Sequence, residues 1–114
     1  MPRGIARVTA NVRVDVPATA TRGEIIEIKT LVAHSMETGF RRTYLGAPIA
    51  RDIITIFVCT YNGVEVFRAE LHPSISANPY IQFTTVATES GTLEFKWSGD
   101  NGFTATETAR ILVT

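Results

Sequence analysis

Residues 53–71 read Ile-Ile-Thr-Ile-Phe-Val-Cys-Thr-Tyr-Asn-Gly-Val-Glu-Val-Phe-Arg-Ala-Glu-Leu, two runs of β-branched, aromatic and other apolar residues joined by Asn62-Gly63. Such residues suit a pleated, half-buried surface, and Asn-Gly supplies the two positive-φ positions of a type I′ turn. The stretch therefore predicts a β-hairpin. Its first strand is apolar at both odd and even positions. We expect it in the middle of a sheet, covered on both faces or lying against a partner protein.

Apolar alternation outside the hairpin predicts five further strands. They cover residues 5–16, 24–34, 80–88, 92–98 and 103–113. The clearest alternation is that of Leu93, Phe95 and Trp97, which we expect in the core. No helical period is sustained, and the length suits one core. We therefore predict one domain over residues 1–114 with an all-β fold, an immunoglobulin-like antiparallel β-sandwich of about seven strands.

Charge and cysteine content exclude several classes of protein. Eleven Lys and Arg balance eleven Asp and Glu, so the chain lacks the broad attraction on which binders of nucleic acids and anionic membranes depend. Its single cysteine cannot form an intramolecular disulfide, and no Cys/His cluster has the spacing of a zinc site. We expect no nucleic acid, no membrane, no metal and no cofactor.

The amino-terminal residues 1–8 contain no continuous apolar stretch. We therefore expect neither a secretory signal peptide nor a transmembrane span. Taken alone, this indicates a cytoplasmic protein. A chain exported while bound to a signal-bearing partner would have the same sequence character.

Catalytic motifs are absent from the sequence, which has no Gly-rich phosphate loop, no His-Glu-x-x-His and no Gly-x-Ser-x-Gly. Cys59 lies in the middle of a predicted strand with no nearby cation, whereas a reactive thiol needs an exposed, electropositive setting. We expect a buried, inert thiol, with an exposed thiol at an interface as the alternative. For His34 and His72 we expect structural or solvated roles, with partner contact as the alternative. The chain is therefore predicted not to be an enzyme.

Residues 35–52 break the strand pattern and contain two Gly, one Pro and three Arg. Loops of this length are uncommon in compact domains and are usually functional or flexible. One interpretation is a crossover whose Phe40 and Tyr44 cap an open end of the core. The other is a recognition loop, because Arg and aromatic residues are enriched at interface hot spots. Its candidate partner-contacting residues are Phe40, Arg41, Arg42, Tyr44 and Arg51.

Charged residues of the same loop offer two sets of ion pairs. Glu37 is close in sequence to Arg41 and Arg42, and Arg51 precedes Asp52. Such pairs either solvate a loop or cross an interface, where charge complementarity fixes register more than affinity.

Seven segments, taken together and in order, carry a family resemblance: residues 23–31 (GEIIEIKTL), 36–42 (METGFRR), 51–54 (RDII), 57–63 (FVCTYNG), 71–73 (LHP), 75–80 (ISANPY) and 85–91 (TVATESG). They closely resemble the Z subunit of the SoxYZ sulfur-carrier family. The resemblance runs from about Gly23 to the carboxyl end, and residues 1–22 add nothing to it.

The resemblance implies an immunoglobulin-type sandwich that forms a heterodimer with a Y-type subunit and carries sulfur intermediates during thiosulfate oxidation in the periplasm. It also implies that the sulfur is held on a cysteine in a Gly-Gly-Cys-Gly-Gly arm near the end of the Y chain. This chain ends Ala-Arg-Ile-Leu-Val-Thr, and Cys59 does not match the carrier motif. The implied role is that of the non-catalytic, non-carrier subunit, which presents the Y chain to the Sox enzymes through transient contacts.

Two further implications concern location and assembly. Because no signal peptide is expected, the resemblance implies export together with the Y partner. Whether the isolated chain forms a homodimer is left as an open alternative. The alternatives to this function are a small thiol-dependent sulfurtransferase that uses Cys59 and a stand-alone structural or adhesive sandwich.

Overall fold

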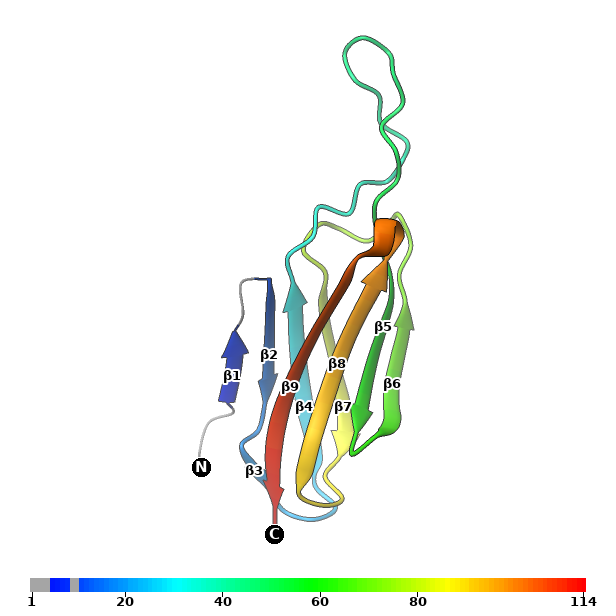
Figure 1. Ribbon diagram of the computed structural model, residues 1–114. Coiled ribbons are helices and arrows are strands. Elements are labelled where there is room, and N and C mark those ends of the chain that lie inside the picture. The colour runs from blue at the N-terminus through cyan, green and yellow to red at the C-terminus, as the bar shows by residue number, and fades with distance from the viewer. Residues whose placement is uncertain (1–4, 9–10) are drawn as a thin grey trace.

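The computed structural model describes residues 5–8 and 11–114, in which nine strands form two packed sheets (Figure 1). One sheet has the order β1-β2-β4-β7 and the other the order β3-β9-β8-β5-β6. The predicted all-β sandwich is therefore confirmed. The strands are β1 (Ile5–Val8), β2 (Val12–Val16), β3 (Thr19–Ala20), β4 (Ile25–Val32), β5 (Ile54–Tyr61), β6 (Val64–Glu70), β7 (Tyr80–Val86), β8 (Gly91–Gly99) and β9 (Thr104–Val113), and a 3-10 turn, η1, covers Asp100–Gly102.

The prediction of about seven strands falls short at two places. Residues 5–16 form two antiparallel strands, β1 and β2, rather than one, and residues 9 and 10 of that predicted strand lie outside the described residues. β3 adds a two-residue strand that pairs parallel with β9. Two residues are too few to show the alternation of apolar and polar side chains that marks a strand, so the sequence pattern could not predict this pairing.

The central hairpin forms as predicted. Asn62 and Gly63 have φ angles of 49° and 83°, as a type I′ turn requires. β5 lies between β6 and β8 in its sheet, as predicted. The described part of the chain itself covers only one face of β5 with a second sheet, and the alternative of contact with a partner protein stays a prediction. The outer β5 residues Ile56 and Val58 are half-buried, with no layer of strands over them in the described residues. Long side chains from β6 and β8 flank Val58 instead, and these can cover apolar surface with their stems.

Alternating residues of both sheets build the core. The inner face of β8 presents Leu93, Phe95 and Trp97, all buried as predicted. The ring of Phe57 on β5 lies 5.0 Å from that of Trp97. The aromatic cluster then continues to the side of the sandwich where β6 and β7 are the last strands, because Phe67 stacks on Phe83 with centroids 4.3 Å apart.

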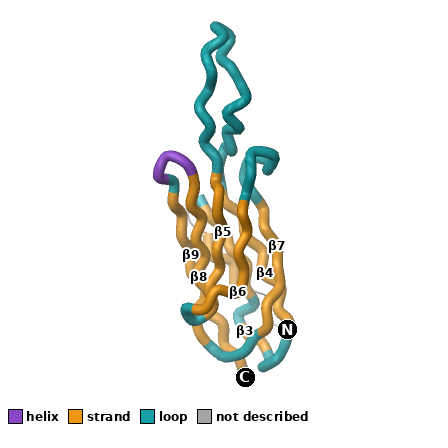
Figure 2. Tube along the Cα trace, turned by 90° about the vertical axis from the view of Figure 1, so that its right-hand side faces the viewer, coloured by secondary structure: helices purple, strands orange, loops and turns teal. Residues whose placement is uncertain are grey.

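A long excursion between β4 and β5 rises from one end of the sandwich (Figure 1). We call residues 35–52 the arm. It extends the molecule to 60 Å along its longest axis, against 23 and 20 Å across. In the side view, the strands β6 and β7 face the viewer and the arm stands above them, away from both sheets (Figure 2).

Candidate partner-binding arm

The arm is an irregular hairpin held by backbone hydrogen bonds. At its base, Glu37 and Asp52 exchange two N–H···O bonds of 2.8 Å. Further out, the Ile49 N–H donates to the Arg41 carbonyl at 3.0 Å. The tip is a three-residue loop closed by the bond of 2.8 Å from the Thr43 N–H to the Ala47 carbonyl. The arm is therefore a built structure although it contains no regular strand.

Gly39 lets the two sides of the arm approach each other. Its φ is +86°, and a Cβ at this position would lie 2.8 Å from Arg51 Cβ and 3.2 Å from Arg51 Cα. Any other L-residue would meet both a strained backbone and the opposite side of the arm. The resemblance segment 36–42 thus contains a residue that the shape of the arm needs.

Each of the three predicted arginines has an acceptor within the chain. Arg41 pairs with Glu37 as predicted. Arg42 donates to the Gly46 carbonyl at 2.9 Å. Arg51 does not pair with Asp52 but makes two hydrogen bonds of 2.9 Å to Asp100 of η1. The arginines therefore act first as braces of the arm, and the same carboxylate of Asp100 also accepts the Ile53 N–H at 3.1 Å.

The arginines lower the pKa values of the two carboxylates they contact, Glu37 and Asp100, which favours the charged form of each. The hydrogen bond from Arg41 is the main cause that lowers the pKa of Glu37 below its ordinary value. The hydrogen bonds from Arg51 and then from the Ile53 amide do the same for the pKa of Asp100. Both carboxylates are therefore ionised at neutral pH and hold their arginines in place.

His34 anchors the base of the arm. Its side chain is nearly buried, its Nδ1 accepts the Met36 N–H at 2.9 Å, and its ring packs edge-on against Phe103 with centroids 4.8 Å apart. Its Nε2 lies 3.8 Å from the Asp52 carboxylate. These contacts agree with the structural role expected for this histidine.

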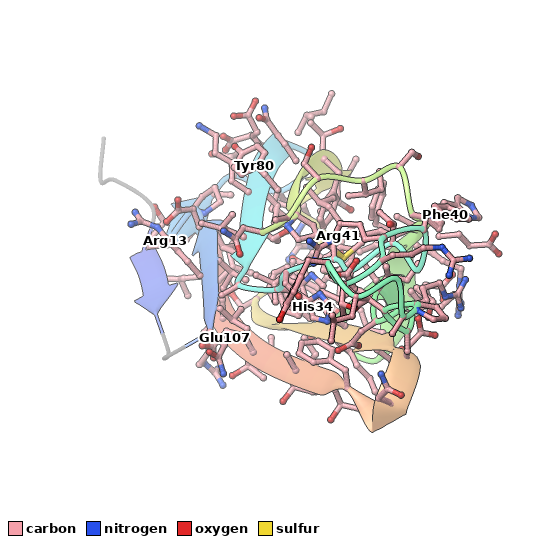
Figure 3. All side chains as sticks on the ribbon, turned by 90° about the horizontal axis from the view of Figure 1, so that it is seen from above. Arg13, His34, Phe40, Arg41, Tyr80 and Glu107 are labelled. Atoms are coloured by element: carbon pink, nitrogen blue, oxygen red, sulfur yellow. The ribbon has the colours of Figure 1, made fainter. Side chains whose placement is uncertain are left out.

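The outer part of the arm displays large apolar side chains to solvent. Phe40 is 83% exposed, Tyr44 96% and Leu45 80%. Seen from above, Phe40 lies at the periphery of the molecule, away from the labelled base residue His34 (Figure 3). The interpretation of Phe40 and Tyr44 as caps of the core is therefore wrong. Met36 closes that end instead, because it is buried and its sulfur accepts the Ile54 N–H at 3.3 Å.

Leu45 is a surface residue that the sequence argument missed. It follows Tyr44 in the tip loop and, like its neighbour, is largely exposed to solvent. The signal was present, since an apolar residue directly before Gly46 in a turn has few ways to reach a core. Asp100 was also missed, because it lies 49 positions from Arg51.

Cys59 is fully buried on β5, and burial raises the pKa of its thiol to about 12. The thiol is therefore protonated at neutral pH, as a buried, inert cysteine should be. Among residues 5–8 and 11–114 no three His, Cys, Asp or Glu side chains gather as a metal site would require. Within the same described residues, no helix is long and apolar enough to cross a membrane.

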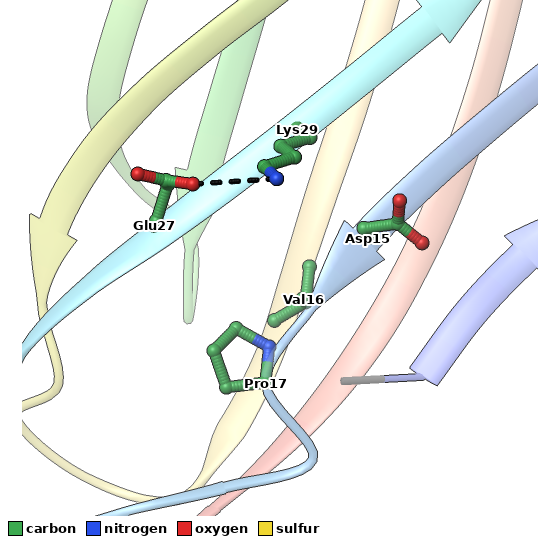
Figure 4. Close-up of a pocket in the computed structure, with 5 residues that line it drawn as sticks. All are labelled: Asp15, Val16, Pro17, Glu27 and Lys29. Carbon is green, nitrogen blue, oxygen red and sulfur yellow. Dashed lines mark ion pairs between the residues drawn. The ribbon is translucent and has the colours of Figure 1, made fainter. Parts of the chain in front are cut away.

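A shallow hollow of about 250 Å³ lies on the outer face of β2 and β4 (Figure 4). Its charged side chains are paired, Lys29 with Glu27 at 3.5 Å within the hollow and Asp15 with Arg13 at 3.5 Å beside it. Exposed pairs of this kind are hydrated and contribute little to stability.

Fold and site together define an immunoglobulin-like sandwich that carries a braced, apolar-tipped arm. A family model described as sulphur oxidation protein SoxZ matches residues 12–110. The chain belongs to the SoxZ family, which connects it with the Sox sulfur-oxidation system. The search of curated proteins returned no significant match.

Solved structures support the fold over nearly the whole chain. A superoxide reductase (neelaredoxin) from Ignicoccus hospitalis matches with a TM-score of 0.70 at 14% identity, over 91% of this chain and 80% of that one. The sulfur carrier protein SoxY from Chlorobium limicola f thiosulfatophilum matches with a TM-score of 0.64 at 10% identity, over 93% of this chain and 81% of that one. At such identities the likeness concerns the fold alone.

Proposed function

We propose that this chain is the non-catalytic Z-type subunit of a SoxYZ-type sulfur carrier and that it binds its Y-type partner through the arm. The observation that carries the proposal is the exposure of Phe40, Tyr44 and Leu45 on an arm whose charged groups are already paired. Apolar side chains displayed in this way cost hydration free energy and stabilise nothing in the isolated chain. A partner that covers them would recover that free energy.

The bracing of the arm favours tight binding. Binding usually costs free energy because loops and side chains must be ordered at the interface. The pairs Arg41–Glu37 and Arg51–Asp100 and the cross-arm hydrogen bonds already hold the backbone in one shape. The arm backbone therefore presents its three apolar anchors at a reduced ordering cost.

In the proposed complex the sulfur chemistry belongs to the Y chain. Cys59 is a poor nucleophile because its thiol is buried and protonated. This chain would then act by holding the Y subunit and by contacting the Sox enzymes that work on it. The proposal carries with it a periplasmic location and export together with the Y partner, which cell fractionation in the presence and absence of the Y gene would test.

The test is co-expression with a candidate Y-type subunit, followed by size-exclusion chromatography with light scattering. We expect a 1:1 complex, and intact mass after thiosulfate turnover should put the added sulfur on the Y chain. Alanine at Phe40, Tyr44 or Leu45 should each weaken association by about 1–3 kcal/mol if these residues are central. Leu112→Ala is the matched control, because Leu112 is an exposed apolar residue of β9, far from the arm in sequence.

Three outcomes would contradict the proposal in different ways. Unchanged affinity in the triple variant Phe40→Ala/Tyr44→Ala/Leu45→Ala would move the interface elsewhere on the sandwich. A sulfur adduct on Cys59 would instead support the sulfurtransferase alternative. A chain that never joins a Y-type subunit would favour the stand-alone structural or adhesive sandwich.

A further inference from the structure

The two sheets end on the same side of the sandwich in strands that differ in character (Figure 2). β6 carries the exposed charges Glu65, Arg68 and Glu70, and its pairing with β5 contains a register shift. Charges and irregularities of this kind keep an edge strand from pairing with another chain. β6 is therefore a protected edge.

β7 lacks these protections. It runs for seven residues, Tyr80–Val86, in unbroken register with β4. The whole segment 71–88 contains no Asp, Glu, Lys or Arg, although such residues make up 19% of the chain. A long, regular and uncharged edge strand is the kind that accepts another strand.

The backbone of β7 has groups available for such pairing. Hydrogen bonds join Val32 to Pro79 at 3.2 Å and Ala87 to Glu24 at 2.8 Å, which sets the alternation between the two strands. The odd-numbered residues of β7 therefore bond to β4. The even-numbered residues turn their backbone N–H and C=O groups away from the sheet, and these residues are Tyr80, Gln82, Thr84 and Val86.

We propose that two copies of this chain pair through β7, antiparallel across a two-fold axis at Phe83, and join their four-stranded sheets into one. This register sets Tyr80 opposite Val86 of the second copy and Gln82 opposite Thr84 of the second copy. All four residues have outward-facing backbone groups, so each pairing is a hydrogen-bonded one. No other two-fold register of the strand pairs all four.

The side chains also suit a second copy. On the outer face, an aromatic residue meets a β-branched one and an amide meets a hydroxyl, with no charge on either side. On the inner face, Phe83 meets Phe83 of the second copy. The pairing would thereby extend the aromatic cluster that ends at the Phe67–Phe83 stack. A self-complementary strand is what a symmetric dimer requires.

A charge-exchange experiment tests the pairing directly. The native chain should sediment at twice its mass of 12.5 kDa. The variants Gln82→Lys/Thr84→Lys and Gln82→Glu/Thr84→Glu place like charges opposite each other, so each alone should dissociate at least about tenfold more readily. An equal mixture of the two should restore the dimer. Both substituted side chains are exposed on the outer face, so thermal unfolding should show folded variants.

The matched control uses β9, which belongs to the other sheet and pairs with β8 at Thr106 and Thr108. Thr106→Lys/Thr108→Lys adds the same charge to exposed threonines there and should leave the dimer unchanged. A second readout uses Gln82→Cys, which lies diagonally across the axis from itself, about 7–8 Å away. A short bismaleimide should link these cysteines, while buried Cys59 should not react and an exposed Thr106→Cys control should be modified without forming a link between copies.

Several outcomes would overturn the inference. The first is a native chain that is monomeric. The second is a dimer whose dissociation is unchanged by the charge variants. The third is a dimer that is cross-linked through Tyr44→Cys on the arm rather than through Gln82→Cys. If Gln82→Cys links only to a Y-type subunit, then β7 pairs with that partner and not with a second copy. The triple alanine variant of the arm should leave the dimer intact, so this inference and the proposed function can fail separately.

Discussion

The sandwich and the arm use the same kinds of residue in opposite ways. In the sandwich, Phe57, Phe95 and Trp97 are buried together and the strands give each ring its place. In the arm, Phe40 and Tyr44 face solvent, while arginine–carboxylate pairs and backbone hydrogen bonds hold the chain. The sandwich is thus organised by apolar burial and the arm by polar bracing.

This difference separates stability from recognition. Removing a ring from the sandwich removes buried contacts, whereas removing one from the arm removes only surface that water already covers. Substitutions in the two regions should therefore affect different measurements.

Trp97→Ala should lower the free energy of unfolding by about 3–5 kcal/mol, because it leaves a cavity at the centre of the aromatic cluster. Urea unfolding followed by circular dichroism measures this change. Tyr44→Ala is the matched control and should stay within about 0.5 kcal/mol of the native value. A large loss of stability in the control would show that the arm contributes to the core after all.

Trp97→Phe sharpens the same comparison. The Trp97 indole N–H is buried and has no hydrogen-bond partner among the described residues. The phenylalanine variant therefore loses volume but no hydrogen bond, and it should be clearly more stable than Trp97→Ala.

Cys59 offers a chemical test of how tightly the sandwich is packed. With a pKa of about 12 against an ordinary value of 9.0, its thiolate fraction at pH 8 falls about a thousandfold relative to the unfolded chain. Because the folded thiol is also inaccessible, a thiol reagent should label Cys59 far more slowly in buffer than in urea. Rapid labelling of the folded chain would reopen the sulfurtransferase alternative.

Local sequence patterns predicted the sandwich well, because the alternation of inward and outward side chains along a strand is visible in neighbouring residues of the sequence. The Asn62-Gly63 turn and the alternation of Leu93, Phe95 and Trp97 are examples. The parallel pairing of Thr19–Ala20 with β9 could not be predicted, since it depends on two distant segments and two residues. The sequence of β5 is apolar on both faces, which suggested a covering layer on each side. Long side chains of the neighbouring strands can cover the outer face of β5 in place of such a layer.

The arm was predictable in composition but not in detail. Its aperiodic run of Gly, Arg and aromatic residues predicted a loop of 35–52, and the structure keeps all five candidate residues exposed. Arg51 pairs with Asp100, which is distant in sequence and is brought next to Arg51 only by the fold. Neighbouring charges such as Arg51 and Asp52 are thus a poor guide to pairing in a long loop.

Acid should loosen the arm before it affects the sandwich. The hydrogen bond from Arg51 lowers the pKa of Asp100 below its ordinary value of 3.8. A carboxylate with a depressed pKa contributes stability that is complete above its ordinary value and is lost as pH falls through the lower folded value. The buried residues of the described chain include no carboxylate, since Thr30 is the one polar residue among them.

Amide NMR distinguishes the two regions during this titration. As pH falls below 4, the Ile53 amide, which donates to Asp100, should shift and exchange faster, while Trp97 fluorescence stays native. Asp100→Asn is the matched variant, because it keeps the shape of the side chain but removes the titrating group. If the Ile53 amide of that variant still moved over the same pH range, another group would control the base of the arm. Simultaneous loss of the native Trp97 signal would mean that arm and sandwich unfold as one unit, and the separation of bracing from burial would then fail.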